Sequence, residues 1–211
     1  MTTHLIETSA EDPDDAVVEA AVRAVRYGEV IAIPSDALYV LVADPLNLNA
    51  VAKVFEAKGR EAHRSLPLLV DSVAMAVEYA GELPSSFYLL ARRFWPGLLT
   101  VIVQASSKVP LRVTGNTGRL ALRRPASALA KRLVAEFGTP LIATSANVSG
   151  KPTCRGGFEV LGTMDGRISL IIDGGIVEGP ASTTIDITAV QWRLIKQGGV
   201  AADDIDACLA E

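Results

Sequence analysis

The sequence is poor in aromatic residues, cysteine and histidine. Aromatic residues make up 5% of the 211 residues, and the chain has only two cysteines, Cys154 and Cys208, and two histidines, His4 and His63. Two distant cysteines exclude a disulfide framework, and so few cysteines and histidines cannot form a zinc site. We therefore expect reduced thiols and no metal-ligating residues.

Long hydrophobic runs and targeting signals are also absent. No run approaches the roughly 18 apolar residues of a membrane span, and residues 1–15 are polar and acid-rich, unlike a signal peptide. A hydrophobic share of 49% excludes disorder, and 211 residues suit one domain. We expect a soluble cytoplasmic protein with a single domain at 1–200 and a short acidic tail at 201–211, which is either helical or frayed.

Charge is unevenly distributed along the chain. The 20 lysines and arginines against 24 aspartates and glutamates give a net charge of −4, which argues against a surface that coats nucleic acid. Residues 84–135 nevertheless contain no acidic residue. This stretch is either a solvated basic face or an anion-binding wall, in which Arg119 and Arg123 share one face of a strand because they lie four residues apart. Its basic residues are Arg92, Arg93, Lys108, Arg112, Arg119, Arg123, Arg124, Lys131 and Arg132.

Hydrophobic periodicity predicts an α/β or α+β fold with a mixed sheet, because strands and helices alternate irregularly. Asn47 and Ser72 are suitable helix N-caps, and Gly28 and Gly138 are suitable helix stops. Helices are predicted over residues 16–27, 47–58, 72–80, 84–94 and 125–137. Strands are predicted over residues 30–33, 66–70, 98–104, 120–122, 140–143, 168–172, 183–187 and 192–196.

Familiar phosphate-binding and hydrolase motifs are absent, and the scarcity of histidine disfavours a Ser-His-Asp site. Four polar clusters remain, at residues 34–39, 58–60 with Arg64, 144–150 and 182–184. We expect them at the ends of apolar strands, where open α/β sheets bind ligands. Singly, each is typical of a turn, a helix C-terminus or backbone capping. Together, their cations, hydroxyls and amides are suited to a polyphosphate.

Seven segments in sequence order resemble motifs of the YrdC family, the threonylcarbamoyl-AMP synthases of tRNA modification. Residues 34–41 are similar to P-T-[DE]-T-x-Y-G-L, residues 58–60 to K-x-R, and residues 94–100 to F-W-P-G-x-[LF]-T. Residues 123–125 are similar to R-x-P, residues 145–150 to S-A-N-x-S-G, residues 182–186 to S-T-x-x-D, and residues 196–198 to R-x-G. The resemblance covers residues 28–198.

The resemblance implies a twisted mixed sheet with flanking helices and a basic concave face. It also implies that L-threonine, bicarbonate and ATP, with Mg²⁺, are condensed to threonylcarbamoyl-AMP and pyrophosphate. A downstream threonylcarbamoyltransferase would then modify adenosine 37 of tRNAs that read codons beginning with A. Longer members have a second domain, for which we expect this chain to be too short.

The same resemblance implies the site residues. Lys58 and Arg60 would be catalytic and would hold ATP phosphates with Arg64. The rest of the ATP site would comprise Arg119, Ser145, Asn147, Thr153 and Lys196. Threonine would be bound by Ser35, Arg123, the Ala143 backbone and Ser182. Attack of a carboxylate on the α-phosphate needs positioning and charge neutralisation more than a histidine acid or base.

Several residues depart from the family pattern. Ala37 stands where the family has a second threonine, and Leu69 lies near the place of a threonine-contacting histidine in some members. Ser65 replaces a common proline. Val40 replaces a glycine, which predicts a crowded turn or a different backbone angle. We hypothesise intact ATP binding with weakened or altered threonine recognition.

Two other functions compete with this interpretation. The first is a module that binds double-stranded RNA or tRNA, although the sequence lacks the interleaved aromatic residues of single-strand readers. The second is a carbamoyl-adenylate enzyme of hydrogenase maturation, whose members are long chains with zinc-finger cysteines that this sequence lacks.

Overall fold

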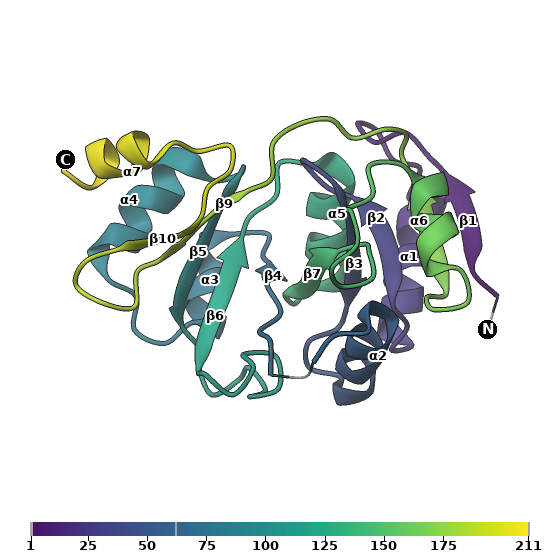
Figure 1. The fold of residues 1–211 in the computed structure, drawn as a ribbon, viewed down its shortest axis with the longest axis horizontal. Coiled ribbons are helices and arrows are strands. Elements are labelled where there is room, and N and C mark those ends of the chain that lie inside the picture. Colours follow the sequence, from purple (N-terminus) through teal and green to yellow (C-terminus); the bar gives the residue numbers. More distant parts are fainter. Residues whose placement is uncertain (1, 62, 211) are drawn as a thin grey trace.

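The computed structural model describes residues 2–61 and 63–210. Within them, ten strands form one sheet in the order β1-β8-β2-β3-β7-β4-β6-β5-β9-β10 (Figure 1). The sheet is mixed, as the sequence predicts. The β1–β8, β8–β2, β4–β6 and β5–β9 pairs are parallel and the others are antiparallel. The strands are β1 (His4–Glu7), β2 (Ile31–Pro34), β3 (Tyr39–Ala43), β4 (Leu68–Leu69), β5 (Leu99–Gln104), β6 (Arg119–Arg123), β7 (Leu141–Ser145), β8 (Leu170–Asp173), β9 (Thr183–Asp186) and β10 (Arg193–Lys196).

Helices flank both ends of this sheet. In Figure 1, α1, α2, α5 and α6 surround the half that contains β2, β3 and β7, whereas α3, α4 and α7 lie beside β5, β9 and β10. The apolar face of α1 buries Val18, Val22 and Val25. The helices are α1 (Asp15–Arg26), α2 (Leu48–Lys58), α3 (Val73–Tyr79), α4 (Ser85–Phe94), α5 (Ala128–Phe137), α6 (Gly157–Met164) and α7 (Ala202–Leu209).

The two-residue strand β4 joins the two halves of the sheet. It pairs in parallel with β6 and antiparallel with β7. The predicted strand at 66–70 is longer than the observed one, because Pro67 has no N–H for the ladder. The backbone N–H of Leu66 donates to Val113 O and that of Val70 to Arg123 O. The sheet is therefore narrow at its centre.

Helix ends follow the predicted caps. The Asn47 side chain accepts hydrogen bonds from the N–H groups of Asn49 and Ala50, and Ser72 accepts one from Met75. Gly138 adopts the left-handed conformation at the end of α5, with φ +88°, which glycine tolerates without a steric cost.

Three elements were not predicted. The β3 segment is buried throughout, so its sequence shows no alternation of apolar and polar residues. Helix α6 contains Gly157 and Gly162, and glycine lowers helix propensity. The edge strand β1 lies in the polar N-terminal segment.

The C-terminal segment forms helix α7, which packs against α4 and buries Ile205. Trp192 Nε1 donates to Asp206 Oδ1 over 2.9 Å. No helix in the described part of the chain is both long and apolar enough to cross a membrane.

Close packing of Gly157 against Asp173 supports the half of the sheet that contains β3. A Cβ atom at Gly157 would overlap the Asp173 carboxylate, whose Oδ1 accepts a hydrogen bond from the buried Tyr39 hydroxyl over 2.8 Å. Burial and then this hydrogen bond raise the pKa of Tyr39, so the phenol stays protonated.

We expect Gly157→Ala to lower the free energy of unfolding by about 2 kcal/mol, because the added methyl group overpacks this contact. Gly162 lies in the same helix with no atom within 4 Å of a built Cβ. Gly162→Ala should therefore raise stability by about 0.5–1 kcal/mol through helix propensity. Urea unfolding measures both, and equal effects would contradict the proposed contact.

Candidate active site

A cleft of about 350 Å³ lies over the centre of the sheet and receives residues from both halves. Seven of the residues predicted for the site line it. These are Ser35, Arg60, Arg123, Ala143, Ser145, Ser182 and Lys196. The other five are not part of the cleft wall that the described residues form. These are Lys58, Arg64, Arg119, Asn147 and Thr153.

The cluster at residues 58–60 does not follow a strand, contrary to the sequence prediction. Helix α2 ends at Lys58, and Gly59 turns the chain in the left-handed conformation at φ +56°. The turn places Arg60 at the cleft wall. The end of helix α2, and not the end of a strand, therefore brings this cluster to the sheet.

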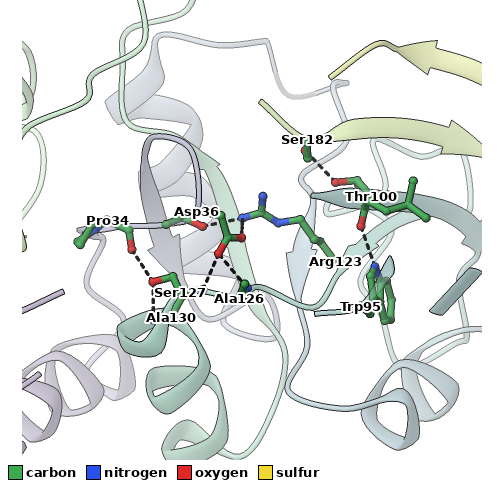
Figure 2. Close-up of polar contacts among 11 residues, drawn as sticks. Pro34, Asp36, Trp95, Thr100, Arg123, Ala126, Ser127, Ala130 and Ser182 are labelled. Carbon is green, nitrogen blue, oxygen red and sulfur yellow. Dashed lines mark hydrogen bonds and ion pairs between the residues drawn. The ribbon is translucent and has the colours of Figure 1, made fainter. Parts of the chain in front are cut away.

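Arg123, at the end of β6, is a buried cation that reaches across β4 to the β2–β3 connection. It is 8% exposed, and its Nη2 atom donates to Ser35 Oγ over 2.6 Å and lies 3.3 Å from Asp36 Oδ2. Figure 2 shows Asp36 between Arg123 and the start of α5, where Asp36 Oδ1 accepts from the Ala126 and Ser127 N–H groups. Burial lowers the pKa of Arg123 and the Asp36 charge opposes this shift.

On the other side of the cleft, Thr100 Oγ1 donates to Ser182 Oγ over 3.0 Å (Figure 2). Thr100 also pairs in register with Thr184 on the neighbouring strand. The chain after β10 returns to this place, because Gly199 N–H donates to Ala181 O over 2.9 Å. A Cβ at Gly198 would overlap the same carbonyl. This close approach holds Lys196 at the cleft.

Lys58 lies behind the 145–151 loop. Its side chain is buried, and Nζ donates to Asn147 O over 2.9 Å, to Asn147 Oδ1 over 3.2 Å and to Ser145 O. Burial and, next, repulsion by Arg60 lower the pKa of Lys58 to about 8, although Cys154 opposes the shift. Only Ser145 of these contacts belongs to the cleft wall.

The remaining predicted residues have different environments. Arg60 Nη2 donates to Ser65 O over 3.0 Å, and its Nε is buried without a hydrogen-bond partner among the described residues. Burial and the neighbouring Arg64 lower the pKa of Arg60. Arg64 and Thr153 are exposed. A buried, unpartnered guanidinium nitrogen beside a cleft fits an anionic ligand.

Arg119 pairs with Asp186 over 3.1 Å. Burial would raise the pKa of Asp186, but hydrogen bonds from Thr188 and the charges of Arg119 and Arg193 together lower it. The carboxylate therefore stays ionised and opposite Arg119.

Several basic residues of the stretch 84–135 form ion pairs with carboxylates in different parts of the structure. Lys108 pairs with Glu78 over 2.7 Å, and Arg132 on α5 pairs with Asp15 on α1 over 2.8 Å. Arg119 and Arg123 also have carboxylate partners. Every one of these carboxylates lies outside the stretch, so the stretch is not one continuous unpaired wall.

Comparison with known proteins assigns the chain to a family. The profile of the Sua5/YciO/YrdC family, described as telomere recombination, matches residues 23–198. The chain belongs to this family. It is 38% identical to a threonylcarbamoyl-AMP synthase of Pyrococcus abyssi over 89% of this chain. A crystal structure of P. abyssi Sua5 complexed with L-threonine superposes with a TM-score of 0.93 at 34% identity, covering 100% of this chain.

The chain is shorter than these two relatives. It spans 55% of the curated P. abyssi protein and 62% of the crystallised Sua5 chain. It covers 100% of a threonylcarbamoyl-AMP synthase of Sodalis glossinidius, which is 33% identical over 92% of this chain. Relatives of both lengths therefore have the same name.

Four departures from the Sua5/YciO/YrdC motifs, Ala37, Val40, Ser65 and Leu69, line the cleft. The prediction that Val40 crowds a turn is wrong. Val40 lies in strand β3, paired with Ile33 and Ser145, and Asn116 is the only described non-glycine residue with positive φ. Leu69 pairs in register with Arg123, so an apolar side chain adjoins the buried cation.

Sequence reasoning did not assign roles to Asp36, Thr100 or Thr184. Asp36 and Thr100 lie inside family motifs, so the signal was present. Their partners are distant in sequence, however, and the motif letters do not show that Asp36 contacts Arg123 or that Thr100 contacts Ser182.

We expect Asp36→Asn to lower the free energy of unfolding by about 3 kcal/mol, because it leaves the buried Arg123 charge uncompensated. The amide oxygen can still accept from the start of α5, which isolates the effect of charge. Asp15→Asn is the matched control, since Asp15 is 87% exposed in its pair with Arg132, and it should cost at most about 0.5 kcal/mol. Equal losses in urea unfolding would refute the role of Asp36.

Proposed function

We propose that the protein condenses L-threonine, bicarbonate and ATP into threonylcarbamoyl-AMP and pyrophosphate. The observation that carries this proposal is that one cleft gathers three cations with four serines, in a chain whose relatives are named threonylcarbamoyl-AMP synthase. The cations are Arg60, Arg123 and Lys196, and the serines are Ser35, Ser65, Ser145 and Ser182.

The amino acid binds at the Arg123 end of the cleft in this proposal. A guanidinium pairs well with a carboxylate because its N–H groups form a planar fork. Ser35 already fixes Nη2 of Arg123, while Ser182 and the Ala143 backbone line the same cleft. The P. abyssi Sua5 complex with L-threonine supports an amino-acid site in this fold.

The triphosphate binds at the Arg60 end. Arg60, Lys196 and Ser145 line the wall. Arg64 follows Arg60 by four residues, Arg119 begins the strand that ends at Arg123, and Thr153 lies in the segment that follows Ser145. Lys58 and Asn147 support this end from behind the loop. No group of three potential metal-ligating side chains occurs among the described residues. Mg²⁺ therefore enters as part of the MgATP substrate, coordinated by phosphate oxygens and water.

The proposed chemistry needs positioning and charge neutralisation. The threonine amine forms an N–C bond with the carbon of bicarbonate, which releases water and gives a carbamate. A carbamate oxygen then forms a bond to the α-phosphorus as the bond to the β-phosphate oxygen breaks and pyrophosphate leaves. The cations of the cleft stabilise the charge that develops on the leaving group.

The product would serve a threonylcarbamoyltransferase that modifies adenosine 37 of tRNA, in the cytoplasm. Binding of double-stranded RNA has less support, because the ion pairs divide the basic stretch between separate places.

Purified protein with L-threonine, bicarbonate and MgATP should form threonylcarbamoyl-AMP, detected by mass spectrometry, with one pyrophosphate per product. Arg60→Ala should weaken ATP binding by about 10- to 100-fold, since a hydrogen bond to a charged group contributes about 1.5–3 kcal/mol. Arg123→Ala should weaken threonine binding more than ATP binding in calorimetry. Absence of the product would overturn the proposal, and a uniform loss with Arg123→Ala would refute that assignment.

The apolar lining beside Arg123 predicts weak selection for the threonine hydroxyl. A hydrophobic pocket rejects an isostere by only about 100-fold, whereas a site that hydrogen-bonds a hydroxyl rejects its absence by about 10⁴-fold or more. We therefore expect kcat/KM for L-valine within about 100-fold of that for L-threonine. Ala37→Thr should increase the preference for threonine, and Ala121→Thr, elsewhere in the cleft, should not. A preference above about 10⁴-fold in the unmodified protein would contradict this interpretation.

A further inference from the structure

We infer that Lys58 and Asn147 are positioning residues, which hold the 145–151 loop and orient the Ser145 hydroxyl at the cleft, and that neither contacts the nucleotide. The inference rests on the proposed function for its ligand, ATP. It is carried by a hydrogen-bond network in which every polar atom of both side chains has a partner within the protein.

The Lys58 ammonium has three N–H donors. They face four oxygen atoms of the loop, namely Ser145 O, Asn147 O, Asn147 Oδ1 and, at the longest distance of 3.4 Å, Ser145 Oγ. No carboxylate of the described residues forms an ion pair with Lys58, so carbonyl dipoles offset its charge. Lys58 is 3% exposed. A phosphate could reach this ammonium only by displacing the loop.

The loop is also held by the Lys58 backbone. The carbonyl oxygen of Lys58 accepts a hydrogen bond from Ser149 N–H over 2.8 Å. The side chain and the main chain of one residue thus bind two parts of the loop. The conformation of the loop depends on the end of α2.

The Asn147 side chain is equally occupied. Both N–H groups of Nδ2 have acceptors, Val148 O at 3.1 Å and Lys151 O at 2.6 Å. Oδ1 accepts from Lys58 Nζ and from Ser145 Oγ, the latter over 2.6 Å. An amide has two donors and one oxygen with two lone pairs, so no capacity is left for a ligand.

This network determines what Ser145 can bind. The single hydroxyl hydrogen of Ser145 is donated to Asn147 Oδ1, and Oγ accepts from Lys58 Nζ over 3.4 Å. Oγ therefore presents only its remaining lone pair to the cleft that it lines. A ligand group at Ser145 must therefore be a donor, such as a ribose hydroxyl, an amine or a metal-bound water. A bare phosphate oxygen is an acceptor and does not match it.

A double-mutant cycle on ATP affinity tests the network. Lys58→Met and Asn147→Ala should each weaken ATP binding about tenfold, and the double variant should also lose about tenfold, because both changes release the same loop. If both residues contacted phosphates independently, the losses would multiply to about 100-fold, and that outcome would overturn the inference. Threonine affinity, titrated on the same variants, should stay within about twofold, whereas general damage to the fold would weaken both ligands.

Two controls accompany the cycle. Lys58→Met combined with Lys196→Ala should give multiplied losses, because Lys196 lies on β10 and forms no hydrogen bond with the loop among the described residues. Lys58→Arg keeps the charge and the donors, so it should recover part of the affinity. If Lys58→Arg recovers no ATP affinity although its 145–151 amides exchange hydrogen at the wild-type rate, the result would count against the network.

Hydrogen exchange of the 145–151 amides tests the same network without a nucleotide. Lys58→Met should accelerate exchange at Ser149 and Lys151, while amides of α1 keep their wild-type rates. Unchanged loop exchange would overturn the inference. If wild-type protein does not bind ATP, the proposed function fails, and the exchange measurement still decides whether Lys58 holds the loop.

Discussion

The arrangement of the cleft depends on the ion pair between the buried Arg123 guanidinium and Asp36. A cation in this position is costly unless a carboxylate and hydrogen-bond acceptors compensate it. Asp36 and Ser35 provide that compensation from the far side of β4. Asp36 also accepts from the N–H groups of Ala126 and Ser127, immediately before α5, so one carboxylate links strand β6, the β2–β3 connection and the segment that leads into a helix. The two halves of the sheet, joined by only two residues of β4, are tied at the place where the ligand would bind.

Pairing of cations with carboxylates also explains how a protein of net charge −4 can have a cationic cleft. Lys108 and Arg132 each have carboxylate partners from other segments, so they add little to the field at the cleft. Arg60 retains a buried nitrogen without a hydrogen-bond partner, and Lys196 is exposed at the wall. The local balance of paired and unpaired cations, which follows from tertiary contacts, matters more for anion binding than the total charge.

Local rules predicted much of the fold. Asn47, Ser72 and Gly138 act at helix ends through contacts within a few residues, which a sequence shows directly. Strand β3 was not predicted because burial on both faces removes the alternation of apolar and polar residues. Helix α6 was not predicted because its glycines are typical of a loop. Family motifs placed seven residues at one cleft. The motifs could not distinguish the residues that line the cleft from those that support it. That distinction between Ser145 on one side and Lys58 and Asn147 on the other depends on hydrogen-bond partners, which the residue types do not show.

The two ends of the cleft follow different physical rules. At the loop end, buried polar groups form a closed network, so a change at one member alters the others. At the Arg123 end, Asp36 and Ser35 fix the cation. Ala37 and Leu69 have no polar side-chain group, so they can change without leaving a buried polar group unpaired. In the proposed function, nucleotide binding would therefore be constrained by cooperativity, whereas the amino-acid side chain would meet a lining that can vary. Ala37, Val40 and Leu69 depart from the family pattern at the cleft, and so does Ser65, which meets Arg60 through a main-chain oxygen that any residue supplies. The 145–150 motif, in contrast, keeps every residue that its network needs.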